Sequence, residues 1–156
     1  MAMPGSEVNR GDVYYIDVPR EDTKHNEMFG SHWHIVVSNS SVHRIGIVIV
    51  VPVTSLNSNE TGQAKDSGQY RHHRIRIFPA GIKWESGQKS FSEVSIVKTE
   101  QIWCMAIERL QGKPRCGKLN ASQMAAIEAG LMHVLDIPTP QISSIGRPVR
   151  PPIRGS

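Results

Sequence analysis

Apolar and polar positions divide the chain into a strand-rich body followed by one segment with helical spacing. Five short runs, rich in β-branched and aromatic residues or alternating in polarity, predict strands near residues 13–18, 34–38, 45–53, 71–78 and 94–100. From Asn120 onward the apolar positions follow a helical period, and Gln123 lies three residues after that asparagine, as in a capping box. A stripe of apolar residues on this helix must pack against the sheet; it consists of Met124, Ile127, Leu131, Val134 and Leu135. The pattern therefore predicts a mainly β fold, a small and strongly twisted barrel closed by a C-terminal amphipathic helix.

Three polar stretches interrupt or follow these elements. Residues 20–31 and 56–70 contain few apolar side chains and predict exposed loops, whereas residues 137–156 combine prolines and arginines and predict an extended basic tail. Pro52 has no N–H to give to a sheet, so we expect its strand to lie at an edge or a bend there, just before Thr54 and Ser55. The domain organisation that follows is one barrel domain over residues 8–136 and a tail over residues 137–156.

Composition places the chain among globular proteins and suggests a phosphate-bearing partner. Of 156 residues, 38% are hydrophobic and 21% charged, and no run approaches the ~18 apolar residues of a membrane span. The first residues lack the apolar core of a secretory signal, so we expect a cytoplasmic protein. The formal net charge is +4, and Cys104 and Cys116 are too few for a four-cysteine zinc site and are expected to be free thiols.

Four ordered motifs resemble the MazF/PemK toxin family. They are Arg10-Gly11-Asp12-Val13-Tyr14, Gly30-Ser31-His32-Trp33-His34-Ile35-Val36-Val37-Ser38-Asn39, Val50-Val51-Pro52-Val53-Thr54-Ser55 and Glu100-Gln101-Ile102. The resemblance covers roughly residues 8–136. It implies an SH3-like barrel with a C-terminal helix, a homodimer, and a sequence-specific endoribonuclease that cuts single-stranded RNA without metal. It also implies a MazE-like antitoxin that covers the RNA groove. Family members usually carry an Arg-Pro pair where this chain has His32-Trp33, so the usual catalytic arginine is replaced by a histidine.

Metal-free RNA cleavage requires a base for the ribose 2′-hydroxyl, stabilisation of the phosphorane charge and a proton for the leaving 5′-oxygen. We assign proton transfer to His32, a hydrogen bond to a non-bridging phosphate oxygen to Thr54, and electrostatic stabilisation to Lys98. Glu100 is a second candidate base. It lies two residues after Lys98 on the predicted strand, so both should share a face, and PemK-type members carry an Arg and an Asp at this spacing. Residues expected to contact RNA are Ser55, Trp33, His25, Arg71, His72 and Arg74.

Each assignment has a structural alternative. His32 could serve packing, Thr54-Ser55 could start a turn, Lys98 and Glu100 could form an ordinary surface pair, and the tryptophans could belong to the core or a dimer interface. His32 and His34 share a predicted strand face, but no glutamate follows at metal-binding spacing, so neither a metal nor a cofactor is expected. The alternative function is a catalytically inactive barrel that binds nucleic acid or a protein partner.

Overall fold

The fold is a single antiparallel sheet with helices packed around it. The computed structural model describes residues 7–24, 26–57 and 63–138. The strands are β1 (Asp12–Val18), β2 (Gly30–Val36), β3 (Ile47–Ser55), β4 (Arg74–Ile77), β5 (Lys83–Trp84), β6 (Ser95–Lys98), β7 (Trp103–Ala106) and β8 (Gly117–Lys118). The helices are α1 (Ser40–Arg44), α2 (Glu108–Gln111) and α3 (Ala121–Val134). Short 3₁₀ turns cover Arg20–Asp22, Gly68–Tyr70 and Pro79–Gly81.

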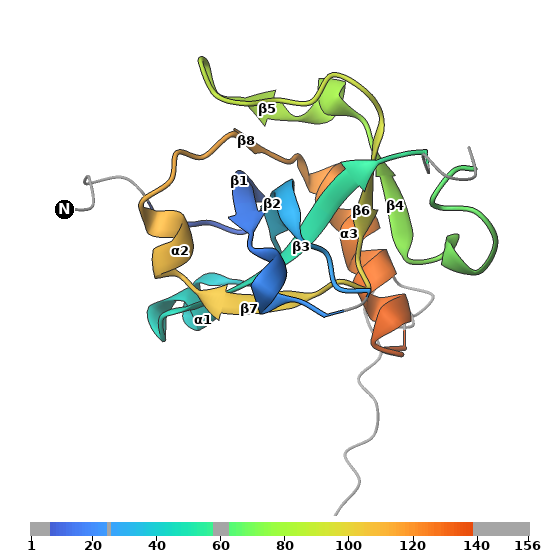
Figure 1. Ribbon diagram of the computed structural model, residues 1–156, viewed down its shortest axis with the longest axis horizontal. Helices are drawn as coiled ribbons and strands as arrows, with labels where there is room; N and C mark the ends of the chain where they lie inside the picture. Colours follow the sequence, from blue (N-terminus) through green and yellow to red (C-terminus); the bar gives the residue numbers. More distant parts are fainter. Residues whose placement is uncertain (1–6, 25, 58–62, 139–156) are drawn as a thin grey trace, which may run out of the picture.

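Strand order explains how the sheet curls. Neighbouring strands follow the order β4-β6-β3-β2-β1-β8-β5, and β7 pairs separately with the first half of β3. Figure 1 shows α3 running along one face, behind β3, β6 and β4, while α2 lies at the opposite end of the molecule. The predicted mainly β architecture closed by a C-terminal helix is confirmed.

Pro52 occupies a gap in the pairing of β3 rather than the edge of the sheet. One side of β3 pairs with β7 as far as Val50 and with β6 from Val53 onward, so Val51 and Pro52 fall between the two partners. On the other side Pro52 is opposite His34 of β2. A central strand tolerates proline at this point because no ladder hydrogen bond is required of its nitrogen on the side that changes partners. Of the two expectations for Pro52, a sheet edge or a bend, the sheet edge was therefore wrong.

Two cores form on opposite faces of the sheet. One cluster, which includes Val53, Val97 and Ile127, fills the space between the sheet and α3. The other, which includes Tyr14, Val36 and Leu110, packs on the opposite face near α2. Leu110 and Val36 are both completely buried. Only part of the second face is covered in this way, and the remainder carries polar side chains.

The C-terminal helix begins as its sequence predicts but ends its apolar stripe earlier. The Asn120 side chain accepts a hydrogen bond from the Gln123 amide at 2.8 Å, and Gln123 returns one to the Asn120 amide at 3.1 Å, which completes the capping box. Leu135, predicted in the stripe, lies just past the helix with 55% of its surface exposed. Close packing against the sheet occurs instead at Gly130, where a Cβ would approach Thr99 Cγ2 to 3.0 Å.

Strand boundaries differ from the predictions where strands are short. The predicted strand over residues 71–78 begins only at Arg74, and the one over residues 94–100 ends at Lys98. The short strands β5, β7 and β8 were not predicted, because two to four residues carry too little alternation to be recognised. Within the described residues, no helix is long and apolar enough to cross a bilayer. Residues 139–156 of the predicted tail lie outside the described residues.

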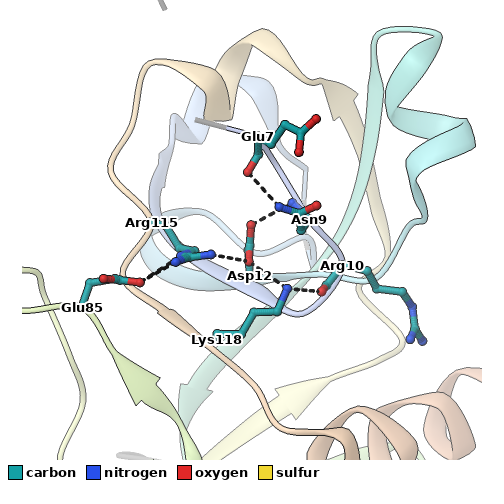
Figure 2. Close-up of polar contacts among 7 residues, drawn as sticks. All are labelled: Glu7, Asn9, Arg10, Asp12, Glu85, Arg115 and Lys118. Carbon is teal, nitrogen blue, oxygen red and sulfur yellow. Dashed lines mark hydrogen bonds and ion pairs between the residues drawn. The ribbon is translucent and has the colours of Figure 1, made fainter. Parts of the chain in front are cut away.

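A buried carboxylate ties the start of β1 to β8 (Figure 2). Asp12 has no exposed surface; it accepts hydrogen bonds from the Asn9 amide at 2.8 Å and from Lys118 Nζ at 3.2 Å. Arg115 lies 3.4 Å from the same carboxylate and pairs more closely with Glu85, at 2.6 Å. Buried carboxylates are stable when charged and hydrogen-bonded partners surround them. The aspartate of the Arg10-Gly11-Asp12 motif is therefore structural, and the network ties β1 to β8 and, through Arg115, to Glu85 after β5.

Candidate functional site

The pairing of β3 with β6 places the predicted hydroxyl and ammonium groups on one face. Val53 of β3 pairs with Val97 of β6, and both side chains belong to the core under α3. Because consecutive side chains in a strand point to opposite faces, Thr54 and Lys98 project from the other side of the sheet. Arg74 of β4 pairs directly with Lys98 and shares that face.

The same alternation of side chains along β2 places His32 on this face and Trp33 on the opposite face. Trp33 pairs with Val53 and packs edge-on between Tyr15 and Phe91, with ring centroids 4.8 and 5.4 Å away. His32, the residue before it on β2, therefore projects from the same face as Thr54. The indole of Trp33 packs against the core side, but the residue is only partly buried and also lines the groove described below, so its predicted contact with RNA stays a prediction.

Lys65 is a site residue that the sequence analysis missed. Its Nζ donates hydrogen bonds to Thr54 Oγ1 at 3.1 Å and to Ser55 Oγ at 3.2 Å. Burial and the nearby charge of Arg74 lower the pKa of Lys65 below its usual value. The residue follows a polar loop with no periodic pattern. The only signal available was its position as the sole lysine between the strands that carry Thr54 and Arg74.

His32 is held in a defined orientation. Its Nε2 lies 3.0 Å from the carbonyl oxygen of Phe29, and because a carbonyl only accepts, Nε2 carries the proton of the neutral ring. The pKa of His32 is lowered, mainly by burial. The backbone carbonyls of Phe29 and Val53 act to raise this pKa, whereas the positive charges of Lys98 and Lys65 act to lower it further. The ring is therefore mostly neutral at neutral pH and able to accept a proton.

Arg74 and Glu100 form an ion pair at the border of the site. Arg74 Nε donates to Glu100 Oε1 at 2.6 Å, its Nη1 donates to the Lys65 carbonyl at 3.0 Å, and its guanidinium lies 3.6 Å over the Tyr70 ring. Glu100 sits in the turn after β6, so the prediction that it lies on the same strand as Lys98 was wrong, although its carboxylate pairs with Arg74, which shares the face of Lys98. The two charges still interact, because Glu100 partly offsets the lowering of the Lys98 pKa by burial and by Arg74.

The remaining predicted RNA contacts are spread more widely. Ser55 is exposed at the end of β3 beside Lys65. Arg71 and His72 lie in the turn before β4, where Arg71 Nε donates to His72 Nε2 at 2.8 Å and the His72 ring is 5.1 Å from that of His133 on α3. His25 lies outside the described residues.

An open groove of about 770 Å³ adjoins the site. His32, Thr54 and Ser55 contribute to one wall and residues 90–95 to another. An extended, flexible polymer suits such an open groove better than a small compact ligand does. Across the described ranges, no three histidine, cysteine, aspartate or glutamate side chains lie close enough together to hold a metal ion.

The arrangement is suited to an anionic ligand. Lys65 places a positive charge against the Thr54 hydroxyl, and Lys98 and the His32 imidazole lie on the same face. Hydrogen bonds from charged donors to a phosphate are about twice as strong as neutral ones. The face can bind a phosphate and can exchange a proton with a group attached to it.

Comparison with known proteins gives a consistent assignment. The family described as PemK-like, MazF-like toxin of type II toxin-antitoxin system matches residues 9–135. None of the curated proteins matches the chain significantly in sequence.

Among solved structures, an endoribonuclease of a mycobacterial species in complex with its cognate antitoxin is 18% identical, with a TM-score of 0.52, and covers 86% of this chain and 100% of its own. Toxin MazF-mt6 of Mycobacterium tuberculosis is 14% identical, with a TM-score of 0.53. The match covers 82% of this chain and 99% of the toxin chain. A chain of a MazE–MazF structure from Deinococcus radiodurans is 14% identical, with a TM-score of 0.52. The match covers 84% of this chain and 98% of that chain. At these identities the likeness shows the shared fold.

Proposed function

Because the chain belongs to the family of PemK-like, MazF-like toxins of type II toxin–antitoxin systems, we propose that it is an endoribonuclease that cuts single-stranded RNA at specific sequences without a metal ion. The observation that carries this proposal is the Thr54 hydroxyl, which is bonded to Lys65 on the face that also carries Lys98 and His32. These groups match the needs of metal-free phosphodiester cleavage, which are a proton acceptor, positive charge and a hydrogen-bond donor for the phosphate.

In the proposed reaction the neutral His32 ring takes the proton of the ribose 2′-hydroxyl. The 2′-oxygen then forms a bond to phosphorus as the bond from phosphorus to the 5′-oxygen breaks. Thr54 and Lys65 hydrogen-bond the non-bridging oxygens, whose charge grows in the transition state. Lys98, to which the sequence alone assigned electrostatic stabilisation, here also donates a proton to the leaving 5′-oxygen. The lowered pKa of Lys98 makes its ammonium a better acid than an ordinary lysine. Solvent restores both protonation states after each turnover.

Glu100 is the alternative base, but its ion pair with Arg74 favours His32. Arg74 Nε donates to Glu100 Oε1 at 2.6 Å, so that oxygen is already engaged and is not free to accept the proton of the 2′-hydroxyl. We propose that Glu100 positions Arg74 and that Arg74 and Ser55 contact the RNA backbone beyond the scissile phosphate.

A second candidate function follows from His32 at the position of the usual arginine. Arginine offers a phosphate several donors at any pH, whereas the neutral His32 ring offers only Nε2–H, which Phe29 already engages. An inactive barrel that binds nucleic acid or a protein partner would show salt-dependent RNA binding without turnover. In that case His32→Arg would restore cleavage.

We further propose a MazE-like antitoxin, a homodimer and a cytoplasmic location. The two antitoxin complexes among the similar structures support the first of these. The antitoxin would cover the groove beside Thr54, so binding of the antitoxin and of RNA should be mutually exclusive. Sedimentation of the purified chain tests the dimer directly.

The decisive experiment incubates the purified protein with a long single-stranded RNA in EDTA and maps the cleavage sites. We expect cuts at a short recurring sequence, and we expect Thr54→Val to lower the rate about 100-fold or more, because it removes a phosphate donor. Ser41→Ala, which removes an exposed hydroxyl on α1, is the matched control and should leave the rate unchanged. Absence of cleavage, or cleavage that EDTA abolishes, rejects the proposal.

A further inference from the structure

A second, smaller cavity lies on the same face as the proposed cleavage site. Its volume is about 230 Å³, below the ~300–1,000 Å³ that is usual for drug-sized ligands. His34 and Pro52 line it from the sheet, Asp22 and Glu27 from the loop between β1 and β2, and Gln101 and Trp103 from the segment that leads into β7. The proposed reaction uses none of these side chains.

His34 offers this cavity an unused hydrogen-bond acceptor. The residue is only 2% exposed, and its Nδ1 lies 3.0 Å from the carbonyl oxygen of His32. Since the carbonyl can only accept, Nδ1 carries the proton, and Nε2 is left with a lone pair. Burial lowers the pKa of His34 to about 4, so the ring stays neutral near neutral pH. Among the described residues, Nε2 has no hydrogen-bond partner.

The other polar groups of the cavity are also mainly acceptors. Asp22 and Glu27 present carboxylates, and within the described part of the chain Glu27 accepts only at Oε2, from the Lys24 amide at 2.9 Å. Gln101 uses its amide nitrogen to donate to the Asn26 carbonyl at 3.0 Å, which leaves its side-chain oxygen available. A ligand that satisfies these groups must therefore bring donors, and the apolar surfaces of Pro52 and Trp103 favour a flat group.

The position of the cavity relates it to the RNA. His34 is two residues from His32 on β2, and Pro52 is two residues from Thr54 on β3, which corresponds to about 7 Å along each strand. A base attached to a nucleotide next to the scissile phosphate can span this separation. We propose that the cavity binds an RNA base that carries an exocyclic amino group, and that His34 Nε2 accepts a hydrogen bond from that group. This inference rests on the proposed function, because it assigns part of the sequence preference of the same site.

A lysine or arginine side chain of a partner protein is the competing occupant, since two carboxylates line the cavity. The base is favoured by the position and the chemistry of the cavity. The cavity lies on the same sheet face as the proposed phosphate site, and its most buried acceptor, the His34 ring, is neutral and adds no charge that would select a cation. Flat apolar walls are also typical of sites that stack unpaired bases.

Nucleosides test the cavity on the wild-type protein without any cleavage. The indole N–H resonance of Trp103 is the reporter, and those of Trp33 and Trp84, which do not line the cavity, are internal references. We expect adenosine to shift the Trp103 signal with a Kd about tenfold lower than that of purine riboside, which lacks the amino group, because one buried hydrogen bond is lost. Equal Kd values for the two nucleosides would overturn the inference, and so would a response to arginine amide but not to adenosine.

Cleavage assays then separate this inference from the proposed function. With oligonucleotides that differ only at the nucleotide flanking the cut, we expect uridine to be disfavoured relative to adenine, cytosine or guanine at one flanking position. His34→Phe, which keeps a ring but removes the acceptor, should reduce that preference at least tenfold. Cleavage that retains its full preference in a folded His34→Phe variant would refute the role of His34 alone. Adenosine binding at Trp103 without any RNA cleavage would instead refute the proposed function.

Discussion

The protonation of His34 gives a quantitative test of the local structure. Burial lowers its pKa from the ordinary 6.5 to about 4. One pKa unit corresponds to about 1.4 kcal/mol, so this fall corresponds to about 3 kcal/mol of folding free energy. Between these two pH values the unfolded chain binds a proton that the folded chain does not. The free energy of unfolding must therefore decrease as the pH falls from 6.5 to 4.

The variant His34→Gln tests this dependence of stability on pH. It removes the titrating ring but keeps a hydrogen-bond donor for the His32 carbonyl. The side chain is buried, so the substitution lowers the free energy of unfolding at every pH. The informative quantity is therefore how the difference in unfolding free energy between wild type and variant changes with pH. Urea unfolding at a series of pH values gives the free energies of both proteins. We expect wild type to lose about 3 kcal/mol more than the variant between pH 7 and pH 4.

A control variant isolates the effect of burial. His72→Gln removes an exposed histidine from the turn before β4 and shows how much the loss of any imidazole contributes. If the difference between wild type and His34→Gln stays constant over this pH range, His34 is not buried as a neutral ring, and the argument about its free Nε2 fails as well.

Three further predictions concern the site and its support. Lys65→Met should lower the RNA cleavage rate about 100-fold, because Lys65 Nζ bonds Thr54, whereas Lys83→Met on the exposed strand β5 should not; equal rates for the two variants would remove Lys65 from the site. The rate of wild-type cleavage should fall on acidification through a pKa that lies below the ordinary 6.5, because burial lowers the pKa of His32 and its neutral ring is the base; a rate that shows no acid limb while the protein stays folded, or one centred above pH 6.5, would contradict this role. Asp12→Ala should cost about 3 kcal/mol in urea unfolding, because it leaves the Asn9 amide and the Lys118 ammonium without their carboxylate; a loss below about 1 kcal/mol would show that the network is dispensable.

Much of the fold could be predicted because its long elements carry clear local signals. The strands around Val36 and Val51 are continuous apolar runs, and α3 has both a capping residue and helical spacing. Strand parity alone also separates His32 from Trp33, since neighbours on a strand face opposite sides.

The contacts that complete the site could not be read from local patterns. Lys65 reaches Thr54 across eleven residues of polar chain, and nothing in that segment indicates which hydroxyl its ammonium meets. Glu100 was assigned to a strand that ends two residues earlier, because Thr99 turns the chain and is buried instead against Gly130 of α3. The gap that accommodates Pro52 depends on two strands that pair with β3 in succession, which is a property of the topology.

The chemistry of the cleaved ends tests the central claim most directly, because it reports which oxygen attacks phosphorus. Mass spectrometry of the products formed in EDTA should find a 2′,3′-cyclic phosphate or its 3′-phosphate on one fragment and a free 5′-hydroxyl on the other. A 2′-deoxy substitution at the scissile nucleotide should prevent the cut. Fragments that end in a 3′-hydroxyl and a 5′-phosphate, or cleavage of the 2′-deoxy substrate, would contradict the roles given to His32, Thr54 and Lys98.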